Sequence, residues 1–175
     1  MRCANMNFIE LCKERYSCKS YSDAAVEPEK LDVILEAGRL APTAKNLQEQ
    51  SVYVIVSEEG PAKIDEATPC RYGAPVVLAV CYDKNNVYTY PGEKHFSGIE
   101  DAAIVATHMM LAATSEGLGS CWLNFFDPDK LKEALDLPEN EELVMLLDIG
   151  YASENGKPLP NHESRKPIED TVKYI

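Results

Sequence analysis

Hydrophobic and polar residues follow two different periods along this chain, one helical and one strand-like. After Pro28, the apolar residues Leu31, Ile34 and Leu35 have the spacing of a helix. Residues 74–82 and 143–149 are read as continuous apolar runs, which are typical of strands covered on both faces. By these patterns, helices are predicted over residues 7–16, 28–39, 59–67, 99–113 and 128–135, and strands over 51–56, 74–82, 120–123 and 143–149. Strands and helices thus alternate from residue 51 to residue 150, which predicts a layered α/β sheet with helices on both faces.

The stretch from residue 99 to residue 126 forms the centre of this predicted arrangement. Between Ala102 and Ala113, only Thr107 and His108 are polar. A helix that is apolar all round is normally buried rather than placed on a surface. We therefore expect a buried central helix that leads directly into a buried strand.

Length and charge narrow the class of protein. The chain has 175 residues, which fits a single domain over residues 1–175. Its formal net charge of −12 disfavours nucleic acid and anionic membranes as partners, because both repel an acidic protein. No apolar run reaches the about 20 residues that cross a bilayer, and the N-terminus has no apolar signal-peptide core. We expect a cytoplasmic location and no membrane partner.

A small basic cluster stands out against this acidic background. Arg15, Ser17 and Lys19 alternate along the chain, and residues two apart face the same way in an extended segment. Two cations and a hydroxyl would then converge on one point, which suits a phosphate ester. The same spacing also fits a solvated charged corner at a helix end, and spacing alone does not decide between the two.

The six cysteines do not form a metal-binding pattern. None belongs to a C-x-x-C pair, which argues against a zinc or iron–sulfur site. Cys81 and Cys121 fall in predicted strands and are expected to be small buried apolar residues. Cys18 lies beside the basic cluster, where a thiol pKa can be lowered, but no acid or histidine partner is close to it in sequence. A reactive thiol there is the minor alternative.

Three segments lack clear periodicity. Residues 43–48 form a short polar loop, and residues 83–97 are polar, rich in tyrosine and the candidate lid of a cleft. Residues 151–175 contain three prolines and no helical stripe. A tail of this kind is expected to wrap over a partner.

Five motifs follow one another in a particular order. They are Arg15-x-Ser17-x-Lys19, Ala41-Pro42-Thr43-Ala44-Lys45-Asn46-Leu47-Gln48, residues 101–113 with Gly117-Leu118-Gly119 and Trp122, Ile149-Gly150-Tyr151, and Arg165-Lys166-Pro167. In this order and spacing, from Phe8 onward, the chain resembles the FMN-dependent nitroreductase family in its compact form.

The resemblance implies an α+β fold with three layers, in which helices flank a central, mainly antiparallel sheet. It also implies a homodimer with FMN in two clefts at the subunit interface. The C-terminal tail, about residues 151–175, would be exchanged between subunits, with residues 171–175 as a donated strand. The second apolar face of the central helix would then contact the partner, and Ala106→Glu would disrupt the dimer.

The resemblance also assigns roles to residues, all of them toward the cofactor. The residues implied in FMN binding are Arg15, Tyr16 and Ser17 with Arg165 near the phosphate, Lys19 near the pyrimidine end, Pro42, Thr43 and Asn46 from the other subunit, and the backbone of Leu123, Asn124 and Phe125 near flavin N5. No catalytic side chain is implied, because the flavin carries the chemistry.

The sequence departs from the family pattern in two regions. Many members have Asn-x-Gln-Pro-Trp where this chain has Asn46-Leu47-Gln48-Glu49-Gln50, so both the proline and the tryptophan are replaced. Asn124 stands where glycine is frequent. The first change affects the start of the first strand, and the second affects the geometry near flavin N5.

The function implied is that of an FMN-dependent oxidoreductase. NADH or NADPH would reduce FMN and leave, and a small electron acceptor such as a nitroaromatic or a quinone would then enter the same cleft, in a ping-pong cycle. One alternative is an FMN-binding protein that stores flavin or senses redox state without turnover. Another is a specialised relative with a longer substrate lid, which residues 83–97 are too few to supply.

Overall fold

The computed structural model describes residues 6–56 and 59–175. Its four strands form one sheet in the order β1-β2-β4-β3, and every neighbouring pair is antiparallel. The strands are β1 (Gln50–Ile55), β2 (Val76–Asp83), β3 (Gly119–Leu123) and β4 (Glu141–Gly150). The sheet confirms the mainly antiparallel α+β arrangement, with β1 and β3 as its edge strands.

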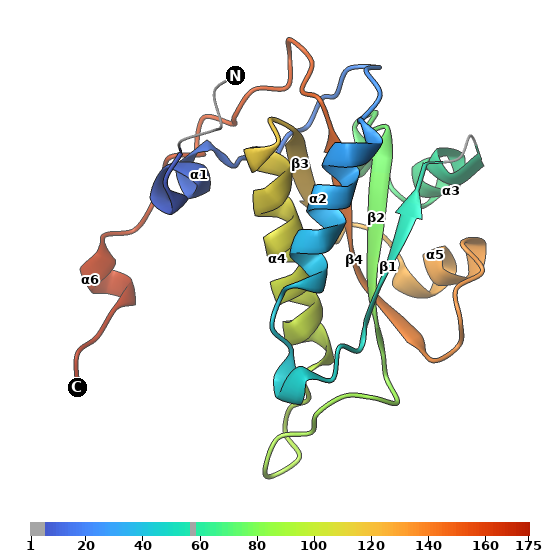
Figure 1. Ribbon diagram of the computed structural model, residues 1–175, viewed down its shortest axis with the longest axis vertical. Coiled ribbons are helices and arrows are strands. Elements are labelled where there is room, and N and C mark those ends of the chain that lie inside the picture. The colour runs from blue at the N-terminus through green and yellow to red at the C-terminus, as the bar shows by residue number, and fades with distance from the viewer. Residues whose placement is uncertain (1–5, 57–58) are drawn as a thin grey trace.

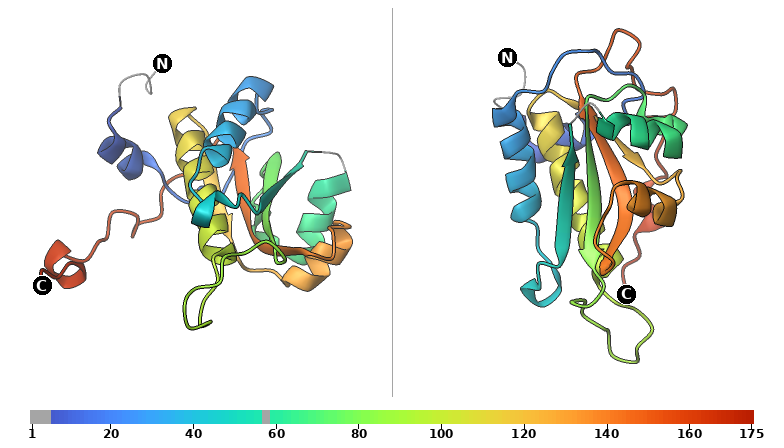
Figure 2. Two further views of the ribbon diagram at one scale, coloured as in Figure 1. Left: turned by 60° about the horizontal axis from the view of Figure 1, so that its bottom comes forward. Right: turned by 90° about the vertical axis from the view of Figure 1, so that its right-hand side faces the viewer.

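Helices cover both faces of the sheet. The helices of the described chain are α1 (Phe8–Glu14), α2 (Pro28–Arg39), α3 (Glu59–Ala67), α4 (Gly98–Ser115), α5 (Pro128–Ala134) and α6 (Ile168–Thr171), together with the 3₁₀ turns η1 (Ala44–Asn46) and η2 (Pro69–Arg71). Helices α2 and α4 pack on one face, and α3 and α5 pack on the other (Figure 2). The three predicted layers are therefore confirmed.

Local sequence signals explain where the helices begin. The side chain of Asn7 caps α1 and forms a capping box with Glu10. Pro28 opens α2, where its missing N–H costs no hydrogen bond. The carboxylate of Asp127 accepts the backbone N–H of Lys130 at the start of α5. These boundaries were therefore open to prediction from neighbouring residues alone.

The two larger apolar clusters of the core are separated by the sheet, and a small third one contains Cys18, Tyr21 and Ala74. On one face, Val105 and Met109 of α4 pack over Leu78 and Leu147 of the central strands. On the other face, the buried cluster includes Ile64 of α3 and Leu131 of α5, with Val77 and Leu146 of the central strands. Each central strand thus has apolar side chains on both of its faces, as its continuous apolar run predicts.

The central helix α4 differs from its prediction in one respect. Val105, Ala106 and Met109 are fully buried against the chain's own sheet. Ile99 and Ile104, however, are 56% and 37% exposed in the single chain. The helix is therefore buried on one side and open on the other. Ala106 points into its own core, so the expectation that Ala106→Glu reports on a dimer contact is wrong, because it would first unfold the subunit.

The C-terminal tail leaves the body of the molecule and passes along α1 (Figure 1). His162 Nε2 lies 3.1 Å from the carbonyl oxygen of Lys13, and the hydroxyl of Tyr16 donates to the carbonyl of Gly156. Thr171 ends the short helix α6 instead of beginning a strand, so this part of the strand prediction is wrong. Exchange of the tail between subunits stays a prediction.

No helix within residues 6–56 and 59–175 is long and apolar enough to cross a membrane.

Candidate functional site

The basic segment, residues 15–19, runs along the edge of the sheet. Its backbone is extended at Arg15, and the N–H of Cys18 donates to the carbonyl of Ser120 at 2.9 Å. Cys18 is fully buried and Tyr16 half-buried, whereas Ser17 and Lys19 are exposed. Burial thus alternates from Ser17 to Lys19, whereas Arg15 is half-buried like Tyr16. The convergence of Arg15, Ser17 and Lys19 on one point stays a prediction.

The outward side chains of the basic segment are available to a ligand. Within the part of the chain that the structure describes, no hydrogen bond or ion pair engages the side chains of Arg15 and Ser17. The ammonium of Lys19 lies 5.7 Å from the centre of the Tyr72 ring, a cation–π contact that leaves its donors free. In a chain of net charge −12, unpaired cations beside a free hydroxyl form a suitable cradle for a phosphate.

The end of β3 supplies backbone donors at the same sheet edge. Ser120 to Leu123 spans about 10 Å along the strand, and β3 has a neighbouring strand of the sheet on one side only. Leu123 is buried and Phe125 is 73% exposed. The amide of Asn124 donates to the carbonyl of Val144 at 3.0 Å. This position, glycine in many relatives, is therefore held by a side-chain contact.

The cofactor loop, residues 42–48, has an unusual backbone. Lys45, Asn46 and Gln48 all have positive φ, near +55°. Non-glycine residues adopt this conformation rarely, so surrounding contacts have to hold it. The hydroxyl of Thr43 accepts the N–H of Gln48 at 3.0 Å, and the side chain of Asn46 is exposed. Pro42 is also exposed, just after the end of α2.

A single chain does not bring the cofactor loop to the basic segment. The two lie at opposite ends of the molecule (Figure 1), and the 12 residues of α2 alone span about 18 Å between them. Residues Pro42, Thr43 and Asn46 therefore cannot meet the same small ligand as Arg15 and Ser17 within one subunit.

Arg165 lies in the tail rather than beside Arg15. Its guanidinium donates to the carbonyls of His162 and Ser164, at 2.5 and 2.7 Å. A surface groove of about 510 Å³ contains it, lined by Ile9, Cys12, Lys13, His162, Glu163 and Arg165. No contact among the described residues joins Arg165 to the basic segment, so its place near the phosphate stays a prediction.

Two buried carboxyl groups beneath the cofactor loop were not predicted. Glu49 is 3% exposed and Asp101 is 4% exposed. Both oxygens of Asp101 accept the N–H of Ala44, at 3.1 and 3.0 Å. The hydroxyl of Ser97 donates to Glu49 Oε1 at 2.8 Å. Burial, and then the neighbouring Asp101, raise the pKa of Glu49. The signal in the sequence that could have revealed this pair was Glu49, an acid where the family pattern has proline.

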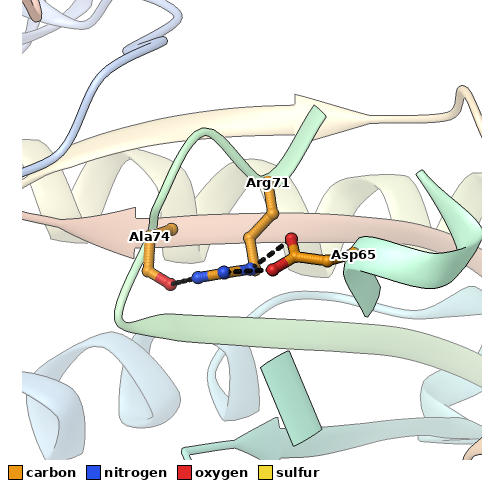
Figure 3. Close-up of polar contacts among 3 residues, drawn as sticks. All are labelled: Asp65, Arg71 and Ala74. Carbon is orange, nitrogen blue, oxygen red and sulfur yellow. Dashed lines mark hydrogen bonds and ion pairs between the residues drawn. The ribbon is translucent and has the colours of Figure 1, made fainter. Parts of the chain in front are cut away.

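A third buried acid, Asp148, corrects the prediction that residues 143–149 are apolar throughout. Its side chain is fully buried in β4, and neither carboxyl oxygen has a hydrogen-bond partner among the described residues. Burial raises its pKa to about 9, although the Arg71 guanidinium opposes that shift. Arg71 itself binds the carboxylate of Asp65 and the carbonyl of Ala74 (Figure 3). Asp148 is therefore a neutral acid in the core.

The five cysteines of the described chain are free thiols, and Cys12 and Cys70 are half-buried. Cys18, Cys81 and Cys121 are buried free thiols, and burial raises the pKa of both Cys81 and Cys121 to about 12. The thiol of Cys18 donates to the carbonyl of Ser20 at 3.3 Å. Among residues 6–56 and 59–175, no group of three or more histidine, cysteine or acidic side chains could hold a metal ion. Cys3 lies outside the described residues.

The fold defines a class: three-layer α+β proteins in which helices cover both faces of an antiparallel sheet. The model of the nitroreductase family matches residues 12–72 and 68–151. A nitroreductase family protein from Clostridium difficile 630 is 42% identical, with a TM-score of 0.90 over 97% of this chain and 98% of that one. The chain therefore belongs to the nitroreductase family.

Two further relatives have names or ligands that bear on chemistry. An FMN reductase (NAD(P)H) from Bacillus subtilis is 30% identical over 87% of this chain and 68% of its own. A protein from Desulfovibrio desulfuricans, solved in complex with FMN, is 26% identical, with a TM-score of 0.81 and 98% of both chains covered. The family and its fold are thus shown by sequence and by structure.

Proposed function

We propose that this protein is a homodimeric, FMN-dependent oxidoreductase that takes electrons from NADH or NADPH and passes them to a small acceptor such as a nitroaromatic or a quinone. The observation that carries the proposal is the cradle at the edge of β3 formed by Arg15, Ser17 and Lys19, whose side chains have no hydrogen bond or ion pair among the described residues. Relatives that reduce FMN by name, or were solved with FMN, support the same ligand.

The residues of the cradle fit the two ends of FMN. Arg15 and Ser17 offer charged and hydroxyl donors that would bind a phosphate, with Tyr16 holding the segment to the tail through Gly156. Lys19 extends from the same side and would place a positive charge beside the edge of the ring where negative charge develops on reduction. Arg165 is the candidate for a second phosphate contact.

The strand end would orient the reactive part of the ring. Backbone N–H groups at Leu123, Asn124 and Phe125 lie at an edge without a further neighbouring strand. When bound, FMN supplies hydride transfer from the nicotinamide and on to the acceptor. The protein then needs no acid or base of its own for this step.

A second subunit would complete each site. Pro42, Thr43 and Asn46 lie too far from the basic segment in one chain, so they would contact the cofactor of the partner. The exposed side of α4, with Ile99 and Ile104, is the candidate interface. The tail at residues 151–175 would cross over the partner, in a dimer with twofold symmetry. A cytoplasmic location belongs to the same proposal.

Anaerobic reduction of the purified protein tests this proposal. We expect a yellow dimer that releases FMN on denaturation and whose flavin absorbance is bleached by NADH or NADPH. Subsequent addition of a nitroaromatic or a quinone should restore the absorbance. A protein that binds FMN tightly but is reduced by neither nucleotide would instead be a storage or sensing protein. A protein that binds no FMN would refute the proposal.

A further inference from the structure

The acid pair, Glu49 and Asp101, lies where the cofactor loop, β1 and α4 meet. Glu49 immediately precedes β1, and Asp101 belongs to the first turn of α4. Both side chains are almost completely buried, at 3% and 4% exposed. Two adjacent buried carboxylates repel each other strongly unless they share a proton. The pair therefore requires an explanation that packing alone does not give.

The hydrogen bonds around the pair show where that proton belongs. Both carboxyl oxygens of Asp101 act as acceptors for the N–H of Ala44. Glu49 Oε1 accepts the hydroxyl of Ser97. Glu49 Oε2 is buried and has no donor among the described residues, and the two acids are joined through Ser97, which donates its hydroxyl to Glu49 and accepts the backbone N–H of Asp101 at its carbonyl, at 2.8 Å. The side chain of Asp101 also raises the pKa of Glu49. A proton on Glu49 Oε2 would let this carboxyl group donate to the Asp101 carboxylate.

No cation neutralises the pair among the described residues. Lys45, the nearest basic residue of the loop, places its ammonium 4.4 Å from the centre of the Tyr88 ring instead. On α4, Glu100 accepts the hydroxyl of Tyr90.

The remaining neighbours also leave the pair without a counter-charge. From β2, Asp83 accepts the N–H of Asn85 and donates its own N–H to the carbonyl of Glu49. The ring of Tyr82 packs against Gly98 at the start of α4. A shared proton is thus the available means of reducing the repulsion between the two carboxyl groups.

We propose that Glu49 and Asp101 share one proton, and that this pair fixes the cofactor loop on α4, so that Glu49 is a positioning residue for the cofactor. The inference rests on the proposed function in one respect, namely that the loop contacts FMN.

Two features of the loop support this role. Three of its residues have the left-handed backbone conformation, which persists only where other contacts hold it. The pair provides such contacts, because Asp101 binds the loop at Ala44 and Glu49 binds Ser97 at the base of residues 83–97. The amide of Asn86 also reaches the carbonyl of Leu47, at 3.4 Å. The pair thus joins the cofactor loop to the candidate lid.

The arrangement is specific to chains with an acid at position 49. Proline, which is frequent there in the family, has no side chain that accepts from Ser97 or donates to Asp101. The proton makes the contact dependent on pH: as the pH rises through the pKa of Glu49, two charges come to face each other and the loop loosens. Glu49→Gln keeps an acceptor for Ser97 and a donor for Asp101, but it does not titrate.

Hydrogen exchange of the Ala44 amide in the FMN-free protein tests the pair directly. In the wild type, the protection factor should fall by up to about tenfold per pH unit above the pKa of Glu49. In Glu49→Gln it should stay constant over the same range. Glu133→Gln is the matched control, because it makes the same chemical change at an exposed side chain of α5. The inference would be overturned if the protection factor of Glu49→Gln fell with pH as in the wild type, or if that of the wild type did not fall.

Carboxyl ¹³C NMR of the wild type provides a second measurement that needs no variant to fold. Coupled titration of the Glu49 and Asp101 signals supports the shared proton, and independent titration of the two signals refutes it.

FMN affinity, measured by fluorescence quenching across the same pH range, separates this inference from the proposed function. Affinity should fall at high pH in the wild type and in Glu133→Gln but not in Glu49→Gln. Equal pH dependence in all three proteins overturns the positioning role and leaves the proposed function intact. If the wild type binds no FMN at any pH, the proposed function and the positioning of FMN both fail, while hydrogen exchange still decides whether the pair holds the loop.

Discussion

The two ends of the molecule place polar groups in opposite ways. At the edge of β3, Arg15, Ser17 and Lys19 are held by a well-packed backbone, but their side chains have few partners in the chain itself. Under the cofactor loop, Glu49 and Asp101 are almost fully buried and engage neighbouring donors. The first arrangement keeps binding capacity free for a ligand. The second uses polar groups to shape the backbone that would meet one.

This difference predicts that the two ends respond differently to substitution. Changes of Arg15 or Ser17 should alter ligand binding with little effect on folding, because neither side chain has a hydrogen bond or ion pair among the described residues. Changes in the acid pair should alter the stability of the subunit first.

The largest effect is expected from Asp101→Ala. It removes both acceptors of the Ala44 N–H and leaves that partly buried donor unpaired, which should lower the free energy of unfolding by about 3 kcal/mol. Urea unfolding followed by circular dichroism measures it. Glu100→Ala is the neighbouring control on an exposed position of α4. A loss no larger than that of the control would show that the loop is held by other contacts.

Asp148→Asn should change how stability depends on pH. The pKa of Asp148 is raised to about 9 in the folded protein, whereas an unfolded chain has an ordinary aspartate pKa near about 4. The folded state therefore keeps a proton that the unfolded state has lost. Its stabilising effect is complete at low pH and decreases as the pH rises toward 9, by up to about 1.4 kcal/mol per pH unit.

Asp148→Asn cannot titrate at this position, so its free energy of unfolding should lack this decrease with pH. Unfolding curves at several pH values, compared between the wild type and Asp148→Asn, measure it. Parallel curves for the two proteins would contradict a neutral Asp148 in the folded state.

Arg15→Ala should weaken FMN binding by at least about tenfold, because it removes a charge-assisted contact to the phosphate. Its free energy of unfolding should change by less than about 0.5 kcal/mol, since the side chain has no partner among the described residues. Fluorescence titration and urea unfolding measure the two quantities. Lys63→Ala, an exposed cation on α3, controls for net charge. A large loss of stability would mean that Arg15 is structural.

A small effect on the isolated subunit is also expected from Ile104→Glu. The side chain is 37% exposed, so the substitution should cost about 1 kcal/mol of stability or less. If this side of α4 is the dimer interface, the variant should nevertheless elute as a monomer in size-exclusion chromatography. A stable dimer in Ile104→Glu would place the interface elsewhere. Thr107→Glu, one turn further along the same exposed side, provides a second position at the same surface.

The sequence by itself determined most of the helices and strands and the layers that they form. The bounds of α2 and α3 agree with prediction, and each strand begins and ends within two residues of its prediction. The alternating positions of Arg15, Ser17 and Lys19 were also apparent from the sequence. Periodicity, caps and turn residues act over a few positions, so the local sequence contains the information that specifies them.

Only the tertiary structure decided which residues meet across the fold. Glu49 and Asp101 are 52 positions apart, and nothing local predicts that they share a buried site. Asp148 lies within an apolar strand, and its burial follows from its register between β2 and β3. The inward direction of Ala106 depends on how α4 sits on the sheet. Contacts of this kind arise from long-range packing, which no local pattern encodes.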